Sequence, residues 1–243
     1  MKITVFNGSP RGAGGNTHSI VKEFARGAEE AGAEVENIFL VTKTIKHCRG
    51  CFSCWTLTPG KCVIEDDMTD LLQRVGGSDA IVFATPLYVD NVSGLMKNFM
   101  DRLIPLADPH FTKDENGECR HLGRENVNLP RKIVVISNSG FPEQNHFQVL
   151  RLLFRRIARN FSAELVGEIY RGAGEILGTK NVFLRAHLIG YRKLVRAAGR
   201  EIVEQGRISE ETMKQLERPL VSDSQYIRGA NKHWDRELEK SRK

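Results

Sequence analysis

The segment from residue 8 to residue 19 carries the strongest chemical signal in the sequence. It reads Gly-Ser-Pro-Arg-Gly-Ala-Gly-Gly-Asn-Thr-His-Ser and joins an apolar run to a segment with helical spacing. Glycines let backbone N–H groups turn inward, hydroxyl groups add donors, and a helix start contributes partial positive charge. These features predict a phosphate-binding loop with Arg11 as a candidate cation. The alternative is a flexible loop in which Asn16 or Thr17 simply caps the helix.

The loop does not match the common nucleotide fingerprints. No Gly-Lys-Ser/Thr ends it, as a P-loop requires, and its glycine spacing differs from G-x-G-x-x-G. ATP and pyrophosphate dinucleotides are therefore disfavoured at this loop. A single terminal phosphate, such as that of FMN, suits a loop that is rich in hydroxyl groups and lacks a lysine.

Four of the five cysteines lie in one short segment, in the pattern C-x2-C-x2-C-x7-C. An odd number of cysteines crowded in this way is not typical of a secreted disulfide framework. Closely spaced thiolates hold iron-sulfur clusters or tetrahedral zinc. Three interpretations stay open for Cys48, Cys51, Cys54 and Cys62: a [4Fe–4S] cluster, a zinc site, or free redox-sensitive thiols.

Strands alternate with helices along the first 170 residues or so. Apolar, β-branched runs predict strands buried on both faces at Ile3–Asn7, Ala80–Ala84 and Lys132–Asn138, with weaker strands at Glu34–Leu40 and Ala163–Tyr170. Helical spacing predicts helices at Asn16–Ala31, Asp66–Val75, Ser93–Leu103 and Glu143–Phe161. The pattern predicts an α/β fold: a doubly wound, five-stranded parallel sheet in the order 2-1-3-4-5.

Ligands of such sheets bind beyond the carboxyl ends of the strands. The third strand ends in a turn where Pro86 restricts the backbone and Tyr88 offers a flat aromatic ring, although Tyr88 at the edge of the core is the alternative. The fourth strand ends in the small polar turn Asn138-Ser139-Gly140. We therefore expect three loops to converge on one crevice.

Separate motifs in the expected order resemble the NAD(P)H-dependent FMN reductases of the flavodoxin-like superfamily. They are the loop at 8–17, the turn Thr85-Pro86-Leu87-Tyr88 and the segment 97–102, and the likeness spans roughly residues 1–170. The cysteine pattern, with residues 63–68 after it, is similar to the compact motif of iron-sulfur flavoproteins, a branch of the same superfamily. Related flavin reductases without a cluster also carry cysteines in this region.

The resemblance implies an FMN-dependent oxidoreductase in which NAD(P)H is the co-substrate and a small molecule or protein is the electron acceptor. A flavodoxin-type electron carrier or redox sensor without its own substrate is the alternative. No side chain need act as a catalytic acid or base, because the flavin does the chemistry. His18 stands where the family often has a small hydroxyl residue. The residues implied to bind FMN are Ser9, Arg11, Asn16, Thr17, His18 and Ser19 at the phosphate, and Pro86, Leu87, Tyr88, Asn138, Ser139 and Gly140 at the isoalloxazine.

We expect an FMN-binding domain over residues 1–171 and a helical extension over 172–243 that is not an independent domain. The segment 107–130 is too long for an ordinary connection and is predicted to be a lid over the exposed face of the flavin. Its scattered His110, Cys119 and His121 are more typical of surface or packing residues than of a metal site. In the extension, Ser209 is a predicted helix start, and the tail after Ser222 is expected to dock on the body or on a second subunit.

Composition limits the partners. The 36 basic and 30 acidic residues are interspersed, so the net charge of +6 forms no block that favours nucleic acid. No apolar run is long enough to cross a membrane, and the first residues lack the layout of a signal peptide. We expect a cytoplasmic protein without nucleic-acid or membrane partners, assembled as a homodimer or homotetramer as the family often is.

Overall fold

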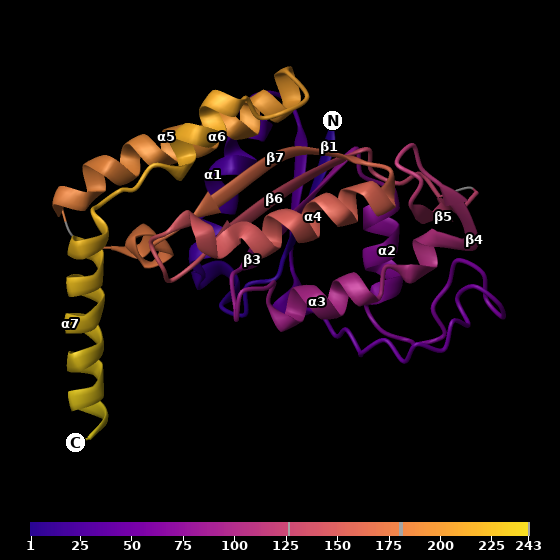
Figure 1. The fold of residues 1–243 in the computed structure, drawn as a ribbon, viewed down its shortest axis with the longest axis horizontal. Helices are drawn as coiled ribbons and strands as arrows, with labels where there is room; N and C mark the ends of the chain where they lie inside the picture. The colour runs from indigo at the N-terminus through magenta and orange to yellow at the C-terminus, as the bar shows by residue number, and fades with distance from the viewer. Residues whose placement is uncertain (126, 180–181, 243) are drawn as a thin grey trace.

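Five parallel strands form the centre of the molecule. The computed structural model describes residues 1–125, 127–179 and 182–242 (Figure 1). The strands are β1 (Lys2–Asn7), β2 (Glu34–Phe39), β3 (Ala80–Pro86), β6 (Lys132–Asn138) and β7 (Glu164–Arg171). Their order, β2-β1-β3-β6-β7, is the predicted 2-1-3-4-5 order, because the intervening β4 (Ala107–Lys113) and β5 (Cys119–Gly123) form a separate antiparallel pair.

Alternating side chains of the strands belong to two separate hydrophobic cores, one on each face of the sheet. Ile3, Val5 and Val82 point to one face of the sheet, whereas Phe6 and Phe83 point to the other. Because successive side chains of a strand point to opposite faces, a strand buried on both faces must be apolar throughout. This is why the three central strands were predicted within two residues of their observed bounds.

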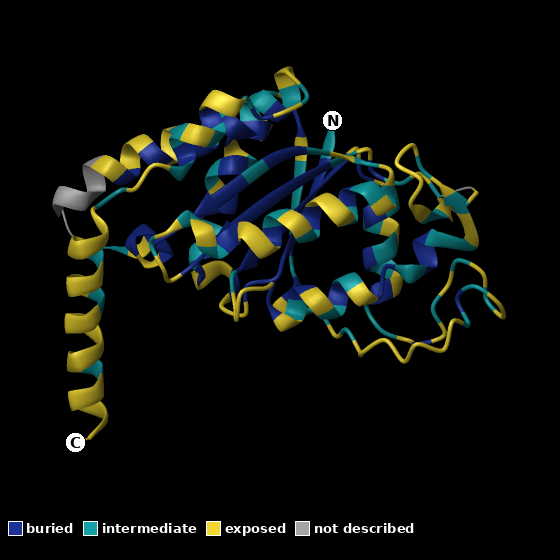
Figure 2. Ribbon diagram, in the orientation of Figure 1, coloured by how far each residue is buried: buried dark blue, intermediate teal, exposed yellow. Residues whose placement is uncertain are grey.

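Helices cover both faces of the sheet. The face with Val82 is covered by α1 (Asn16–Glu30), α5 (Val182–Glu204) and α6 (Glu210–Glu217). The face with Phe83 is covered by α2 (Met68–Gly76), α3 (Gly94–Asp101) and α4 (Gln148–Phe161). The last helix, α7 (Asp223–Ser241), has no buried residue and extends away from the body (Figure 2).

The predicted C-terminal extension contributes to the main core. Leu188, Val195 and Ile202 of α5 are buried with the side chains of α1 and the sheet. The predicted start residue Ser209 is the N-cap of α6, and its hydroxyl accepts a hydrogen bond from the Thr212 amide at 3.2 Å. In the tail, Tyr226 at the start of α7 packs against the body, while Trp234 further along is 55% exposed.

Helices α1 and α5 cross at a pair of glycines. A methyl group on Gly27 would fall well inside contact distance of the Arg196 carbonyl, and one on Gly199 would meet the Phe24 carbonyl in the same way. The two backbones therefore approach each other directly. A salt bridge between Arg196 and Glu23 closes the contact beside the glycines.

The segment 107–130 does not cap the carboxyl edge of the sheet, so the predicted lid position is wrong. It begins after α3, which ends at the amino edge, and it must reach the amino end of β6. Both of its ends therefore lie at the amino edge, and the β4–β5 hairpin packs there (Figure 1). Arg159 at the end of α4 holds the hairpin through Asp114, with 2.7 Å between Nε and Oδ2.

None of the helices in the described part of the chain is both long and apolar enough to span a lipid bilayer.

The α1–α5 crossing predicts opposite outcomes for two glycine substitutions on α5. Gly199→Ala should destabilise the protein by about 1–3 kcal/mol, because the methyl group forces the two backbones apart. Gly190→Ala, whose methyl group would meet none of the described atoms within 4 Å, should instead stabilise it by up to about 1 kcal/mol through helix propensity. Urea unfolding of both variants measures the difference, and equal effects would contradict the tight crossing.

Candidate functional site

The loop after β1 folds back on itself at the carboxyl edge. The Gly12 amide donates to the Ser9 carbonyl at 3.0 Å, and the Gly15 amide donates to the Gly12 carbonyl at 3.1 Å. Gly12 has φ +52°, a left-handed conformation that glycine adopts without strain. This turn delivers the chain directly to the start of α1.

The start of α1 is open for an anion. Gly15 occupies the N-cap position, where no side chain caps the described helix. The first-turn amides of Asn16, Thr17 and His18 have no acceptor within an α-helix, so they point out of its end. The side chain of Ser9, 2% exposed, fills the space where a Cβ of residue 15 would lie. The hydroxyl group of Ser9 is thus held against the helix start.

Buried hydrogen bonds tie the loop after β3 to the loop after β1. Ser93, the N-cap of α3, donates through its hydroxyl to the Gly8 carbonyl at 2.6 Å and accepts from the Met96 amide at 3.2 Å. The Ser93 amide in turn donates to the Thr85 hydroxyl at 3.0 Å. Ser93 and Thr85 were not predicted as site residues, although a serine before an apolar helical segment is a recognisable N-cap signal.

Asn138 joins the end of β6 to both neighbouring loops. Its side-chain amide donates to the Thr17 hydroxyl at 2.7 Å, and its backbone carbonyl accepts from the Leu87 amide at 2.8 Å. Ser139 donates through its hydroxyl to the Phe141 carbonyl at 2.7 Å. The three loops therefore converge as predicted, and many of their hydroxyl, amide and carbonyl groups form hydrogen bonds with one another.

Tyr88 stands on a strained turn at this edge. Its backbone exchanges two hydrogen bonds with Asn91, at 2.9 and 3.0 Å, around Val89 and Asp90. Val89 has φ +48° and Asp90 has φ +56°, and a left-handed β-branched residue is uncommon. The turn leaves the Tyr88 side chain 45% exposed, so the ring is available to a ligand.

The side chain of His18 points away from the first loop. Its Nδ1 lies 3.4 Å from Asn37 Nδ2, and its ring packs edge-on against Phe39. Burial, together with the nearby Lys22, lowers the pKa of His18 below its ordinary value. The imidazole is therefore predominantly neutral at pH 7 and brings no positive charge to a phosphate.

A cleft of about 1100 Å³ opens beside the first loop. Arg11 and Asn16 line one side of it, and Tyr226, His233 and Arg236 of α7 line the other. The hydroxyl group of Tyr226 donates to the Gly140 carbonyl at 2.7 Å and so fixes α7 to the loop after β6. Sequence reasoning did not assign α7 to this edge, because nothing in its pattern shows where an exposed helix lies.

The cysteine loop, residues 43–67, lies along α3 and ends near the amino edge of the sheet. Cys48, Cys51, Cys54 and Cys62 line a single small pocket, and all four are free thiols. A hydrogen bond donated by Ser53 lowers the pKa of the exposed Cys51. Burial raises the pKa of Cys54, and the neighbouring thiols add to this effect.

A buried ion pair closes the base of the cysteine loop. The side chains of Arg102, at the end of α3, and of Asp66 are both buried, and Arg102 Nη1 donates to Asp66 Oδ2 at 2.7 Å. Arg102 also donates to the Lys46 carbonyl at 2.6 Å and to Cys62 Sγ at 3.4 Å. One guanidinium thus holds the start of the loop, its end and one of the four thiols.

The four thiols are suitable ligands for an iron-sulfur cluster, but the pocket between them is too small to hold one. Within the described residues, no three His, Cys, Asp or Glu side chains are arranged to hold a metal ion. The pocket between the thiols has a free volume of about 20 Å³, room for about one water molecule. Either a cluster or a zinc ion therefore requires the exposed part of the loop to rearrange.

Comparison with known proteins agrees with this geometry. Residues 1–116 match the model of the family described as NADPH-dependent FMN reductase. An iron-sulfur flavoprotein of Archaeoglobus fulgidus is 35% identical over 144 residues, which is 59% of this chain and 58% of that protein. Over part of its length this chain is similar to the FMN reductases and to the iron-sulfur flavoproteins. A second iron-sulfur flavoprotein, from Methanocaldococcus jannaschii, is 39% identical over 106 residues, 44% of this chain and 53% of the relative.

The match to these iron-sulfur flavoproteins is partial, because the aligned part spans little more than half of their length. Solved structures extend the likeness of fold. An FMN-dependent NADH-azoreductase from Bacillus anthracis, solved with FMN, has a TM-score of 0.60 at 17% identity and covers 84% of this chain and 99% of its own. A quinone oxidoreductase from Methanothermobacter marburgensis has a TM-score of 0.57 at 14% identity, covering 83% and 96%.

The Arg102–Asp66 pair predicts a large loss of stability when one partner is removed. Asp66→Ala leaves the Arg102 guanidinium buried without its counter-charge, so the free energy of unfolding should fall by about 3–5 kcal/mol. Asp101→Ala is the control, because it breaks an exposed pair with Lys97 and should change stability by less than about 1 kcal/mol. Urea unfolding of the two variants would disprove the claim if the losses were similar.

Proposed function

We propose that this protein is an FMN-dependent oxidoreductase whose flavin lies at the carboxyl edge of the sheet. The observation that carries the proposal is the uncapped start of α1, where Ser9 and Thr17 are buried beside free backbone amides. A helix start with hydroxyl donors stabilises an anion without a lysine. The match to the NADPH-dependent FMN reductase model over residues 1–116 supports the same cofactor.

Within this proposal the first loop binds the FMN phosphate. The amides of the first turn of α1 and the hydroxyl of Ser9 donate to the phosphate, and the exposed Arg11 adds a positive charge. Asn16 and Ser19 border the same loop. His18 would contribute its backbone amide, because its side chain is engaged by Asn37 and Phe39.

The other two loops would orient the isoalloxazine. Pro86 and Leu87 border it from the end of β3, with the half-exposed Tyr88 ring beside them. Asn138, Ser139 and Gly140 border it from the end of β6. FMN, when bound, accepts a hydride and passes electrons on singly or in pairs. The protein would hold the isoalloxazine in one orientation. The hydrogen bonds among the loops favour this role because they fix the loops relative to one another.

The cleft between the first loop and α7 suits the dinucleotide co-substrate. Its volume, about 1100 Å³, exceeds what a phosphate and ribityl chain need. Arg11 and Arg236 lie on opposite walls, and paired cations are suited to the phosphates of NADH or NADPH. This arrangement favours an enzyme with its own reductant over a carrier reduced only by a partner protein.

The cysteine loop is proposed to hold an iron-sulfur cluster. All four cysteines line one pocket, and the relatives of similar sequence are named iron-sulfur flavoproteins. Cys48 and Cys51 are exposed and lie on the part of the loop that must rearrange, whereas Cys54 and Cys62 lie nearer its base. A cluster supplies one-electron transfer. The Arg102 side chain beside Cys62 would donate a hydrogen bond to a ligand sulfur.

The phosphate site predicts that two adjacent glycines respond differently. Gly15→Ala displaces the Ser9 hydroxyl, so FMN affinity should fall by at least roughly tenfold, the value of one hydrogen bond to a charged group. A methyl group on Gly14 would lie more than 4 Å from every atom in the described part of the chain, so Gly14→Ala should leave affinity unchanged. Flavin fluorescence titration measures both affinities.

The same titrated protein tests the activity. Anaerobic NADH or NADPH should bleach the flavin absorbance of the native and Gly14→Ala proteins. If native protein binds no FMN, the assignment of the first loop fails; if it binds FMN that neither dinucleotide reduces, the co-substrate assignment fails.

The cysteine proposal predicts selective loss of iron. Protein made anaerobically with iron supplied should contain iron and absorb broadly in the visible range, and Cys51→Ala should lose both while FMN stays bound. Cys119→Ala is the control, because Cys119 lies on β5, outside the cysteine pocket. Quantified iron and flavin decide the matter; an iron-free native protein would reject the cluster.

A further inference from the structure

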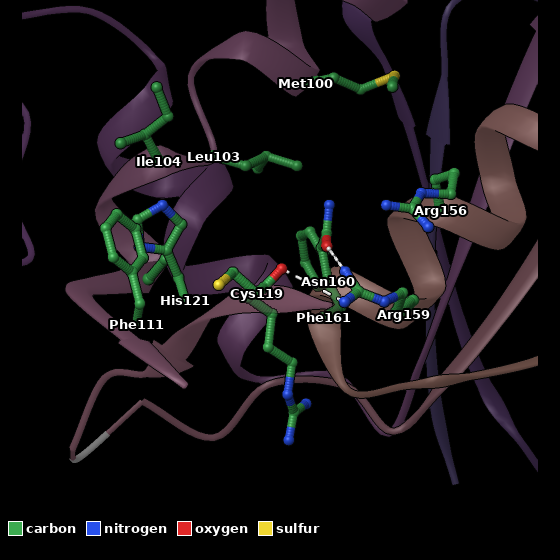
Figure 3. Close-up of a pocket in the computed structure, with 12 residues that line it drawn as sticks. Met100, Leu103, Ile104, Phe111, Cys119, His121, Arg156, Arg159, Asn160 and Phe161 are labelled. Atoms are coloured by element: carbon green, nitrogen blue, oxygen red, sulfur yellow. Dashed lines mark hydrogen bonds between the residues drawn. The ribbon is translucent and has the colours of Figure 1, made fainter. Parts of the chain in front are cut away.

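A second cleft opens at the amino edge of the sheet, between the β4–β5 hairpin and the ends of α3 and α4. Its volume is about 430 Å³. Met100, Leu103 and Phe161 give it apolar walls. Figure 3 shows Phe111 and His121 side by side on one side of the cleft, with Arg156 on the opposite side. The cleft is separate from the FMN edge, and no step of the proposed function uses it.

The cleft has a small positive excess. Arg156 donates to Glu118 Oε2 at 2.6 Å, and Arg159 donates to Asp114 Oδ2 at 2.7 Å. Arg120 also lines the cleft and has no carboxylate partner among the described residues. Three guanidinium groups therefore face two carboxylates. The excess charge is that of Arg120, which donates to the Ser162 hydroxyl. The Arg156–Glu118 pair is half-exposed and therefore weak, so Arg156, which lies opposite Phe111 and His121 in Figure 3, can exchange Glu118 for the carboxylate of a ligand.

His121 is incompletely satisfied. Its Nδ1 is buried and has no hydrogen-bond partner in the described structure. The ring is held between Trp55 and Phe111, with 4.8 Å between centroids on each side. Buried polar atoms without a partner are uncommon in folded proteins, so this ring nitrogen marks the wall as a place where a ligand is missing. An aromatic wall with one unpaired ring nitrogen favours a flat ligand.

We infer that this cleft binds a small aromatic monoanion, such as an aryl carboxylate. The ring would pack between Leu103 and the Phe111–His121 wall, and the carboxylate would accept hydrogen bonds from Arg156 and Asn160 on the opposite side. The cleft has the size of ordinary small-molecule sites, which are apolar with a few converging polar groups. Apolar walls disfavour inorganic anions, and a single excess charge disfavours polyanions.

The cleft is connected to the cysteine loop through direct contacts. Trp55, on that loop, packs on His121 and donates from Nε1 to the Ile104 carbonyl at 3.2 Å. Ile104 lines both this cleft and the cysteine pocket. The inferred site therefore adjoins the proposed cluster without contacting the flavin. Its existence does not depend on FMN binding.

The test uses 2-naphthoate as the probe and the uncharged 2-naphthylmethanol for comparison. Isothermal titration of the full-length protein should detect naphthoate binding that Arg156→Gln weakens by about tenfold or more, the value of a charge-assisted hydrogen bond. Arg155→Gln, one residue away on α4 and outside the cleft, should change the affinity less than twofold. Thermal melting of each variant establishes that it is folded.

A second readout localises the probe. The chain has two tryptophans, so its amide NMR spectrum shows two indole signals, and Trp234→Phe assigns them. Naphthoate should shift the Trp55 signal and leave that of Trp234 in place, with the same affinity in the Gly15→Ala variant. The inference is overturned if naphthoate causes no heat or shift at millimolar concentration, if naphthylmethanol binds equally well, or if the two arginine variants behave alike.

Discussion

Helix α3 is fixed at both ends by buried polar contacts, and the arrangement of the two candidate sites depends on it. At its start, Ser93 donates to the Gly8 carbonyl and so joins the loops after β1 and β3. At its end, Arg102 forms the buried pair with Asp66 that closes the cysteine loop. A buried ion pair adds little net stability relative to apolar packing, but the loss of either partner leaves a buried charge without compensation. Its value here is to specify where the loop is anchored.

This anchoring places the two sites on opposite edges of one sheet. The hydroxyl-rich loops lie where parallel strands end, and the cysteine loop and the hairpin lie toward the edge where they begin. Helix α3 has eight residues, which corresponds to about 12 Å of rise. A group bound at the cysteines and a flavin bound beside Tyr88 would therefore be separated by roughly a helix length of packed protein. The two bound groups would therefore contact different residues and different solvent.

Sequence patterns predicted the elements well and the tertiary contacts poorly. Strands buried on both faces are apolar without interruption, so the sheet and its order followed from the pattern. The β4–β5 hairpin was missed because Asp108, Pro109 and Lys113 interrupt any alternation in its first strand. Its location was mispredicted because length alone suggested a lid, whereas the connection from α3 to β6 confines it to the amino edge.

In the candidate site, too, local features were predictable from the sequence and tertiary contacts were not. The loop after β1 was recognisable because glycines, hydroxyl groups and a helix start adjoin in sequence. The side-chain direction of His18 was not, because it depends on Asn37 and Phe39 of another strand. The Arg102–Asp66 pair joins residues 36 positions apart, with no pattern to mark either one.

The glycine crossing of α1 and α5 has a consequence for how the chain is made. Helix α1 leaves the ribosome early, but the helix that packs on it arrives more than 150 residues later. Until then, one face of the growing sheet has only part of its cover, and contacts of such wide separation form slowly. In the nascent protein, the loop after β1 therefore lies beside a sheet face that α5 does not yet cover. A prematurely terminated product would expose that apolar face and would be prone to aggregation.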